Sequence, residues 1–90
     1  MFILRKNDQL QEKMAELTRI ELFVMETVKK KRKALKMSQI TLSQLLEKSD
    51  SFVGQVENHR KNAKYNLNHI NALAEVFKCS PKDFLPEKSL

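Results

Sequence analysis

Residues 38–58 read SQITLSQLLEKSDSFVGQVEN and carry the strongest structural signal in the chain. Leu42, Leu45 and Leu46 give the first half of this stretch an apolar side at helical spacing. Residues 47–48 follow in the place of a tight turn. The pattern therefore predicts a short helix and a turn, with a second short helix after them.

The second helix has an apolar face and a polar face. Val53 and Val56 lie three residues apart on the apolar face, as neighbours on a helix do. Ser51, Gln55 and Asn58 are spaced four and three residues apart and form the polar face. A helix that is anchored by two valines and displays Ser, Gln and Asn can present hydrogen-bonding groups to the edges of DNA bases.

The start of the second helix offers further assignments, two of which have alternatives. Ser49 is expected to cap the helix, because its hydroxyl can accept an unpaired amide of the first turn. Asp50 then lies where the helix dipole favours a carboxylate. Phe52 either belongs to the core or is half exposed and in reach of a thymine methyl group. Gly54, which costs about 1 kcal/mol relative to Ala in a helix, allows close packing on the preceding helix or a close approach to DNA.

Length and composition favour one small all-α domain. The chain has 90 residues with one Gly and two Pro, and it is rich in helix-forming Leu, Lys, Glu and Gln. It contains no apolar run of the length needed to cross a membrane. Cys79 is the single cysteine, so no disulfide framework is expected and a cytoplasmic location fits.

The residue pattern predicts neither a metal site nor an active site. His59, His69 and Cys79 are ten residues apart from one to the next, which matches no metal-ligand spacing. There is no glycine-rich phosphate loop and no nucleophile motif. We therefore expect no metal, no cofactor and no enzymatic activity.

The net charge of +6 is concentrated around residues 38–58. Residues 29–64 carry ten basic and three acidic side chains, a balance of +7, while the flanking segments are close to neutral. A basic block beside a polar helix is typical of a surface that binds nucleic-acid phosphates. A solvated charged face is the alternative explanation of such a block.

The region around residues 38–58 resembles the helix-turn-helix of the Cro/phage-repressor family, the XRE-type regulators. The residues that carry the resemblance are Ser38, Gln39, Leu42, Leu46, Ser49, Phe52, Val53, Gln55, Val56 and Glu57, and it extends from about Val28 to Leu85. It implies an all-α, five-helix, lambda-repressor-like DNA-binding domain, which we place at residues 18–86. The family usually has a Gly in the turn where this chain has Glu47. Either Glu47 takes a positive φ, or the turn has another shape.

The resemblance and the polar face together assign candidate site residues. Base readout is assigned to Asp50, Ser51 and Gln55, although Asp50 could instead serve only as a cap. Contacts with phosphates, or the register on DNA, are assigned to Gln39, Ser49, Asn58, Arg60, Lys61 and Lys64. In the family an Arg at the position of Arg32 pairs with a Glu at the position of Glu57. Such a pair removes the cost of an unpaired charge on the core-facing side of a helix.

Further helices are expected on both sides of the motif. Thr18 and Glu21 form a capping box for a helix that ends at about Leu35. The residues expected to share its inner side are Ile20, Val24, Val28 and Leu35. Asn66 or Asn68 caps a helix with Leu67, Ile70, Leu73, Ala74 and Phe77 inward. Ser80, Pro81 and Asp83 start a last helix, after which Phe84 and Leu85 close the core.

The two ends of the chain fall outside this domain. In residues 1–17 a capping box at Asp8 and Gln11 would place Leu10, Met14 and Leu17 on one helix face. This segment is either a frayed arm or a dimer-forming helix. Residues 87–90 are expected to form a loose tail.

The function expected from these observations is sequence-specific binding of double-stranded DNA by a transcriptional regulator. The resemblance implies a homodimer on a two-fold-related site, with half-sites ~34 Å apart. Phage repressors, restriction controllers and antitoxins with a cognate toxin partner all use such a domain. The alternative is a protein–protein adapter that bridges transcription factors with the same fold. The basic block argues against the adapter, which has no need of phosphate-directed charge.

Overall fold

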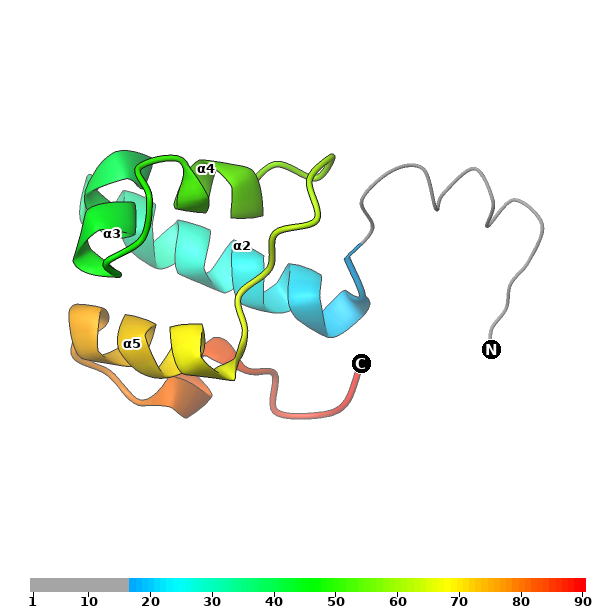
Figure 1. Cartoon of the computed structure of the whole chain (residues 1–90). Coiled ribbons are helices and arrows are strands. Elements are labelled where there is room, and N and C mark those ends of the chain that lie inside the picture. Colours follow the sequence, from blue (N-terminus) through cyan, green and yellow to red (C-terminus); the bar gives the residue numbers. More distant parts are fainter. Residues whose placement is uncertain (1–16) are drawn as a thin grey trace.

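The computed structural model describes residues 17–90, which form four α-helices and one 3-10 helix, with no strand among the described residues. The helices are α2 (Arg19–Ala34), α3 (Gln39–Leu45), α4 (Phe52–Val56), α5 (Leu67–Phe77) and the 3-10 helix η1 (Pro81–Phe84). Figure 1 shows α2 running between the α3–α4 pair and α5. The predicted all-α class is confirmed. The expected fifth helix is the single 3-10 helix η1 rather than an α-helix.

Local capping signals start all of these helices except α4. The Thr18 hydroxyl accepts a hydrogen bond from the Glu21 amide at 3.2 Å, and the Glu21 carboxylate accepts one from the Thr18 amide at 2.9 Å. Ser38 caps α3, Asn66 caps α5 and Ser80 caps η1, each by accepting a backbone amide of the following turn. These side chains satisfy amides that have no partner within the helix, so each helix begins at a defined residue.

The core is made of apolar side chains from every helix and from the loop after α4. Its buried members are Val24, Met25, Val28, Leu42, Leu46, Val53, Val56, Tyr65, Ile70, Leu73, Ala74 and Phe84. Leu17, Phe52, Phe77 and Cys79 are partly buried and pack against this core. The core holds α3 and α4 against α2 and thereby sets the orientation of the polar face of α4.

Five residues expected in the interior lie at the surface. Ile20, Leu35, Leu45, Leu67 and Leu85 are all exposed, and Leu67 has 78% of its surface accessible. Four of them stand at or near a helix terminus. Ile20 and Leu67 lie in the first turns of α2 and α5. Leu45 is the last residue of α3, and Leu35 is the C-cap of α2. Helical periodicity places a residue on one side of a helix, but burial also requires a neighbouring element that covers that place. Met25, which was not assigned to the core, is buried beside Val24 and Val28.

The predictions for Asp8, Gln11, Leu10 and Met14 lie outside the described residues. The division into an arm (1–17), a domain (18–86) and a tail (87–90) therefore stays a prediction. Among the described residues no helix combines the length and the apolar character needed to cross a membrane.

Candidate nucleic-acid interface

The turn between α3 and α4 is closed by backbone hydrogen bonds. The Glu47 amide donates to the Gln44 carbonyl and the Lys48 amide to the Ser43 carbonyl, each at 2.9 Å. Glu47 has a φ of 60°, so the first of the two alternatives for this turn is the one the structure takes. A left-handed residue is a common way to end a helix, although it is usually Gly. Lys36 and Lys78 end α2 and α5 with similar positive φ values of 55° and 56°.

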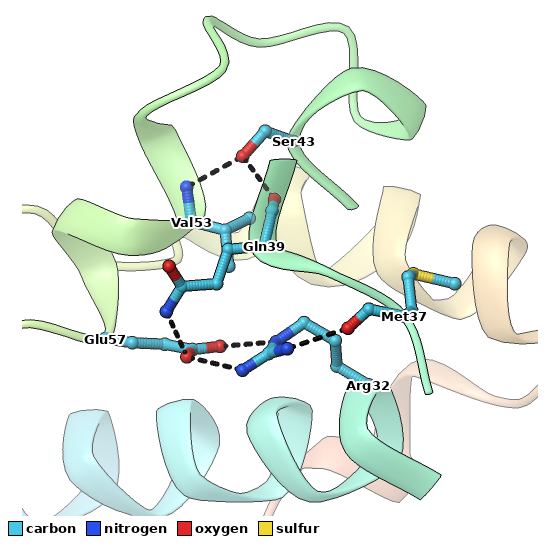
Figure 2. A network of polar contacts seen from close by, with 6 residues as sticks. All are labelled: Arg32, Met37, Gln39, Ser43, Val53 and Glu57. Atoms are coloured by element: carbon cyan, nitrogen blue, oxygen red, sulfur yellow. Dashed lines mark hydrogen bonds and ion pairs between the residues drawn. The ribbon is translucent and has the colours of Figure 1, made fainter. Parts of the chain in front are cut away.

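Ser43 joins α3 to α4 from within the core. Its side chain is fully buried, and its hydroxyl donates to the Gln39 carbonyl at 2.9 Å and accepts from the Val53 amide at 3.0 Å (Figure 2). The Val53 amide belongs to the first turn of α4 and has no acceptor within that helix. Ser43 therefore stabilises the start of α4 from the neighbouring helix. Sequence analysis did not single out Ser43, although its place between Leu42 and Leu46 on the inner side of α3 was a usable signal.

The start of α4 differs from the expected one. The helix begins at Phe52, and the side chain of its N-cap residue, Ser51, makes no capping hydrogen bond. Ser49 is therefore not the cap; its hydroxyl oxygen lies 3.4 Å from that of Ser51. Because Ser43 already supplies an acceptor for the Val53 amide, α4 starts without the predicted cap. Asp50 and Ser51 precede the helix instead of forming its first turn.

Arg32 and Glu57 form a buried, bidentate ion pair between α2 and the end of α4. Arg32 Nε donates to Glu57 Oε2 at 3.0 Å, and its terminal nitrogen Nη2 donates to Oε1 at 2.8 Å. The other terminal nitrogen donates to the Met37 carbonyl at 2.8 Å. The Arg32 and Glu57 side chains are only 8% and 3% exposed. Geometry of this kind compensates for the removal of two charges from water.

Gln39 extends this ion pair to the surface. Its amide nitrogen Nε2 donates to Glu57 Oε1 at 2.9 Å, so Oε1 accepts from Arg32 and Gln39 together (Figure 2). Gln39 is the first residue of α3 and is exposed. The polar network therefore runs from the buried guanidinium of α2 to an exposed amide at the start of α3.

The three candidates for base readout are exposed and lie close together. The Gln55 amide donates to the Ser51 hydroxyl at 3.1 Å, so these two side chains share one face. The Asp50 carboxylate accepts from the Gln44 amide at 3.2 Å, across the turn. On the opposite side of α4, Val53 and Val56 are fully buried. The polar surface that holds Asp50, Ser51 and Gln55 is therefore formed by the short helix α4 and by the turn before it.

Four of the six candidates for phosphate contacts, Asn58, Arg60, Lys61 and Lys64, follow α4, and they differ in how free they are to bind a phosphate. Arg60 and Lys61 are exposed, and the Asn58 side chain holds their loop by accepting from the Arg60 amide at 2.9 Å. Lys64 instead pairs with Glu21 of α2 at 3.3 Å. Burial alone would raise the Glu21 pKa, but hydrogen bonds from Thr18 and Lys64 outweigh it and hold this pKa below its ordinary value. The positive charge of Lys64 is therefore partly balanced within the chain.

An aromatic cluster supports α4 and the start of α5. The Phe52 ring centroid lies 4.9 Å from that of His69 and 5.9 Å from that of Tyr65, and Lys48 Nζ lies over the Phe52 ring at 5.6 Å. Phe52 is partly buried and packs against the core, and this packing favours the core assignment. Burial, followed by the Glu57 charge, raises the pKa of the Tyr65 hydroxyl, which has no hydrogen-bond partner among the described residues.

His69 belongs to this cluster through its contacts with the Phe52 and Tyr65 rings. Its Nδ1 accepts from the Asn66 amide at 3.0 Å, and its own amide donates to the Asn66 side chain at 2.8 Å. Burial and, after it, the charge of Lys48 lower the His69 pKa. His69 is therefore a structural residue that caps α5.

Gly54 lies against the side chain of Gln39. A Cβ atom at position 54 would lie 3.2 Å from Gln39 Oε1 and 3.8 Å from its Cδ. The neighbour of Gly54 is thus the preceding helix, in agreement with the packing alternative. In residues 17–90, no three His, Cys, Asp or Glu side chains come together as metal ligands would.

The helices α3 and α4 and the residues around them lie in a region that matches a known protein family. The family model of the Cro/C1-type HTH DNA-binding domain matches residues 30–86. No curated protein matches the chain in sequence. Two solved structures of FeII HppE in complex with substrate, form 1 and form 2, are 23% identical to the chain with a TM-score of 0.63. They match 77% and 78% of this chain, which covers only 39% and 36% of theirs. At this identity the likeness shows the fold alone.

Proposed function

The chain belongs to the Cro/C1-type helix-turn-helix DNA-binding family, and from this premise we propose that it is a transcriptional regulator that recognises a specific sequence of double-stranded DNA. The observation that carries the proposal is the two-sided character of α4. Val53 and Val56 are buried, whereas Ser51 and Gln55 are exposed and hydrogen-bonded to each other. The buried apolar face fixes the orientation of α4, and a fixed orientation of its polar face is what base readout in a major groove requires.

We assign base contacts to Ser51 and Gln55. The Gln55 amide can bond an adenine through N6 and N7, a contact worth about 1–3 kcal/mol of discrimination. Asp50 could accept from a cytosine amino group, although its bond with Gln44 already holds it in the turn. Phosphate contacts are assigned to Gln39, Ser49, Asn58, Arg60 and Lys61. Lys64 would also contact a phosphate once its ion pair with Glu21 is broken. Breaking this pair costs little free energy, because the pair is partly exposed.

We further propose that the protein acts in the cytoplasm as a repressor-like homodimer on a two-fold-related site, and we assign it no catalytic activity. Residues 1–17 are the proposed dimer-forming segment. An apolar surface beside their attachment point supports this assignment: Leu22 and Phe23 are exposed on α2 and line a hollow of about 400 Å³ together with Leu90. A cognate toxin is a second candidate partner.

Two substitutions test the proposal when binding to a selected DNA site is measured over a range of salt concentrations. Gln55→Ala should relax preference at one base position in each half-site and leave the salt dependence nearly unchanged. Lys61→Ala should weaken binding to all sequences alike and flatten the slope of log affinity against log salt by about one unit. If Gln55→Ala discriminates among sequences as the wild type does, α4 does not read the bases. Salt-insensitive binding to a protein, with no DNA binding, would favour the adapter.

A further inference from the structure

The Gln39 amide is held on two sides by residues one turn apart, Gly54 within α4 and Glu57 at the C-cap of this helix. Glu57 Oε1 accepts from Gln39 Nε2 at 2.9 Å, and Gly54 leaves the space into which Gln39 Oε1 is turned. Figure 2 shows the Gln39 side chain between α3 and the end of α4, directed toward Glu57. Glu57 is itself held by two hydrogen bonds from Arg32. The position of the amide is therefore fixed from the core.

We propose that Gly54 and Glu57 are positioning residues that together orient the Gln39 amide for contact with a DNA phosphate. This inference rests on the proposed function and assigns two residues that act through Gln39. It also accounts for the single glycine of the chain, which stands inside α4 where it lowers helix propensity.

The hydrogen-bonding capacities of the groups fix which way the amide faces. A carboxylate only accepts, so the Gln39 nitrogen must face Glu57 and its oxygen must face Gly54. The nitrogen carries two hydrogens, of which Glu57 Oε1 takes one. The second hydrogen stays free to donate to an acceptor such as a phosphate oxygen, while the amide oxygen, which a phosphate would repel, is kept against α4.

A methyl group at position 54 would disturb this arrangement without disturbing the core. Its contact of 3.2 Å with Gln39 Oε1 is tighter than an ordinary van der Waals contact, so the amide would have to move by a few tenths of an ångström. Glu57 cannot follow this movement, because Arg32 holds both of its oxygens. The bond between Gln39 and Glu57 would therefore weaken and the amide would lose its fixed orientation.

The test is Gly54→Ala, which should lower the affinity for DNA without lowering the stability of the fold. The melting temperature should stay the same or rise, because Ala favours the helix. Affinity for the selected DNA site should fall about threefold to tenfold, the range of one hydrogen bond. The salt slope should not change, because Gln39 is neutral. Asn71→Ala, at an exposed position of α5, is the matched control, which should also favour its helix and should leave affinity unchanged.

A double-mutant cycle with Gln39→Ala decides whether Gly54 acts through Gln39. In the Gln39→Ala background, Gly54→Ala should cause no further loss of affinity. An equal loss in both backgrounds, or no loss in the wild-type background, would overturn the inference. Both of these outcomes presuppose that the wild-type protein binds DNA with sequence preference. Failure of the wild type to bind would instead overturn the proposed function.

Discussion

Replacing Glu57 with Gln should destabilise the domain strongly while changing the side chain by a single group. Glu57 accepts two hydrogen bonds from Arg32 and one from Gln39, and its side chain is only 3% exposed. In the variant one of the two accepting oxygens becomes an NH₂ group that faces a donor, and the buried guanidinium loses its counter-charge. Removing one partner of a buried pair costs about 3–5 kcal/mol. For a domain of this size that loss corresponds to a melting temperature lower by roughly 12 °C or more.

The assay is thermal unfolding followed by circular dichroism at neutral pH, with Glu21→Gln as the matched control. Glu21 also loses an ion pair in this control, but its pair with Lys64 is partly exposed and Gln can replace Glu in the capping box with Thr18. The control should therefore lose less than about 1 kcal/mol. If Glu57→Gln melts within about 2 °C of the wild type, the pair is not compensating for buried charge and the reasoning fails.

Three further predictions concern the helix boundaries. Glu47→Gly should raise the free energy of unfolding by about 1 kcal/mol in chemical denaturation, because Gly adopts a φ of 60° without strain. A less stable variant would mean that the Glu47 side chain stabilises the fold by more than its strained backbone destabilises it. Ser43→Ala should lower it by about 1–3 kcal/mol, because the buried Val53 amide loses its acceptor; an unchanged value would show that the amide finds another partner. The His69 pKa lies below its ordinary value of 6.5, so the folded state binds fewer protons than the unfolded state, and stability should fall as the pH drops below 6.5 toward that lowered value. His69→Gln, which keeps an acceptor for the Asn66 amide, should flatten melting temperatures measured between pH 5 and 7.5, and an unchanged pH profile would assign the effect to other groups.

Much of the fold could be predicted because the decisive signals are local. The capping residues Thr18, Ser38, Asn66 and Ser80 act on amides two or three residues further along the chain, so spacing alone reveals them. The apolar faces of α3 and α4 follow in the same way from helical periodicity. Periodicity failed at helix ends such as Leu67, because burial there depends on which neighbouring element reaches that far.

The candidate site was harder to predict because its contacts join residues distant in sequence. Ser43 and Val53 are ten positions apart, and Gln39 and Glu57 eighteen. No local pattern predicts that a hydroxyl of one helix accepts a hydrogen bond from the first turn of another. For this reason the sequence pattern indicates Ser49 as the acceptor for a first-turn amide of α4, whereas Ser43 is the acceptor in the structure. For the same reason the Lys64–Glu21 pair did not follow from charge counting, since the two residues lie 43 positions apart.

The side chain of Arg32 has a consequence for how far the DNA-binding motif can be treated as a separable module. This one residue of α2 contacts Glu57 at the end of α4 and the Met37 carbonyl just before α3, so both ends of the motif are attached to a helix outside it. Excision of residues 37–58 would leave the Glu57 carboxylate without its cation and the Met37 carbonyl without its donor. Grafting the polar face of α4 onto another scaffold would therefore require the transfer of Arg32 and the turn of α2 that presents it.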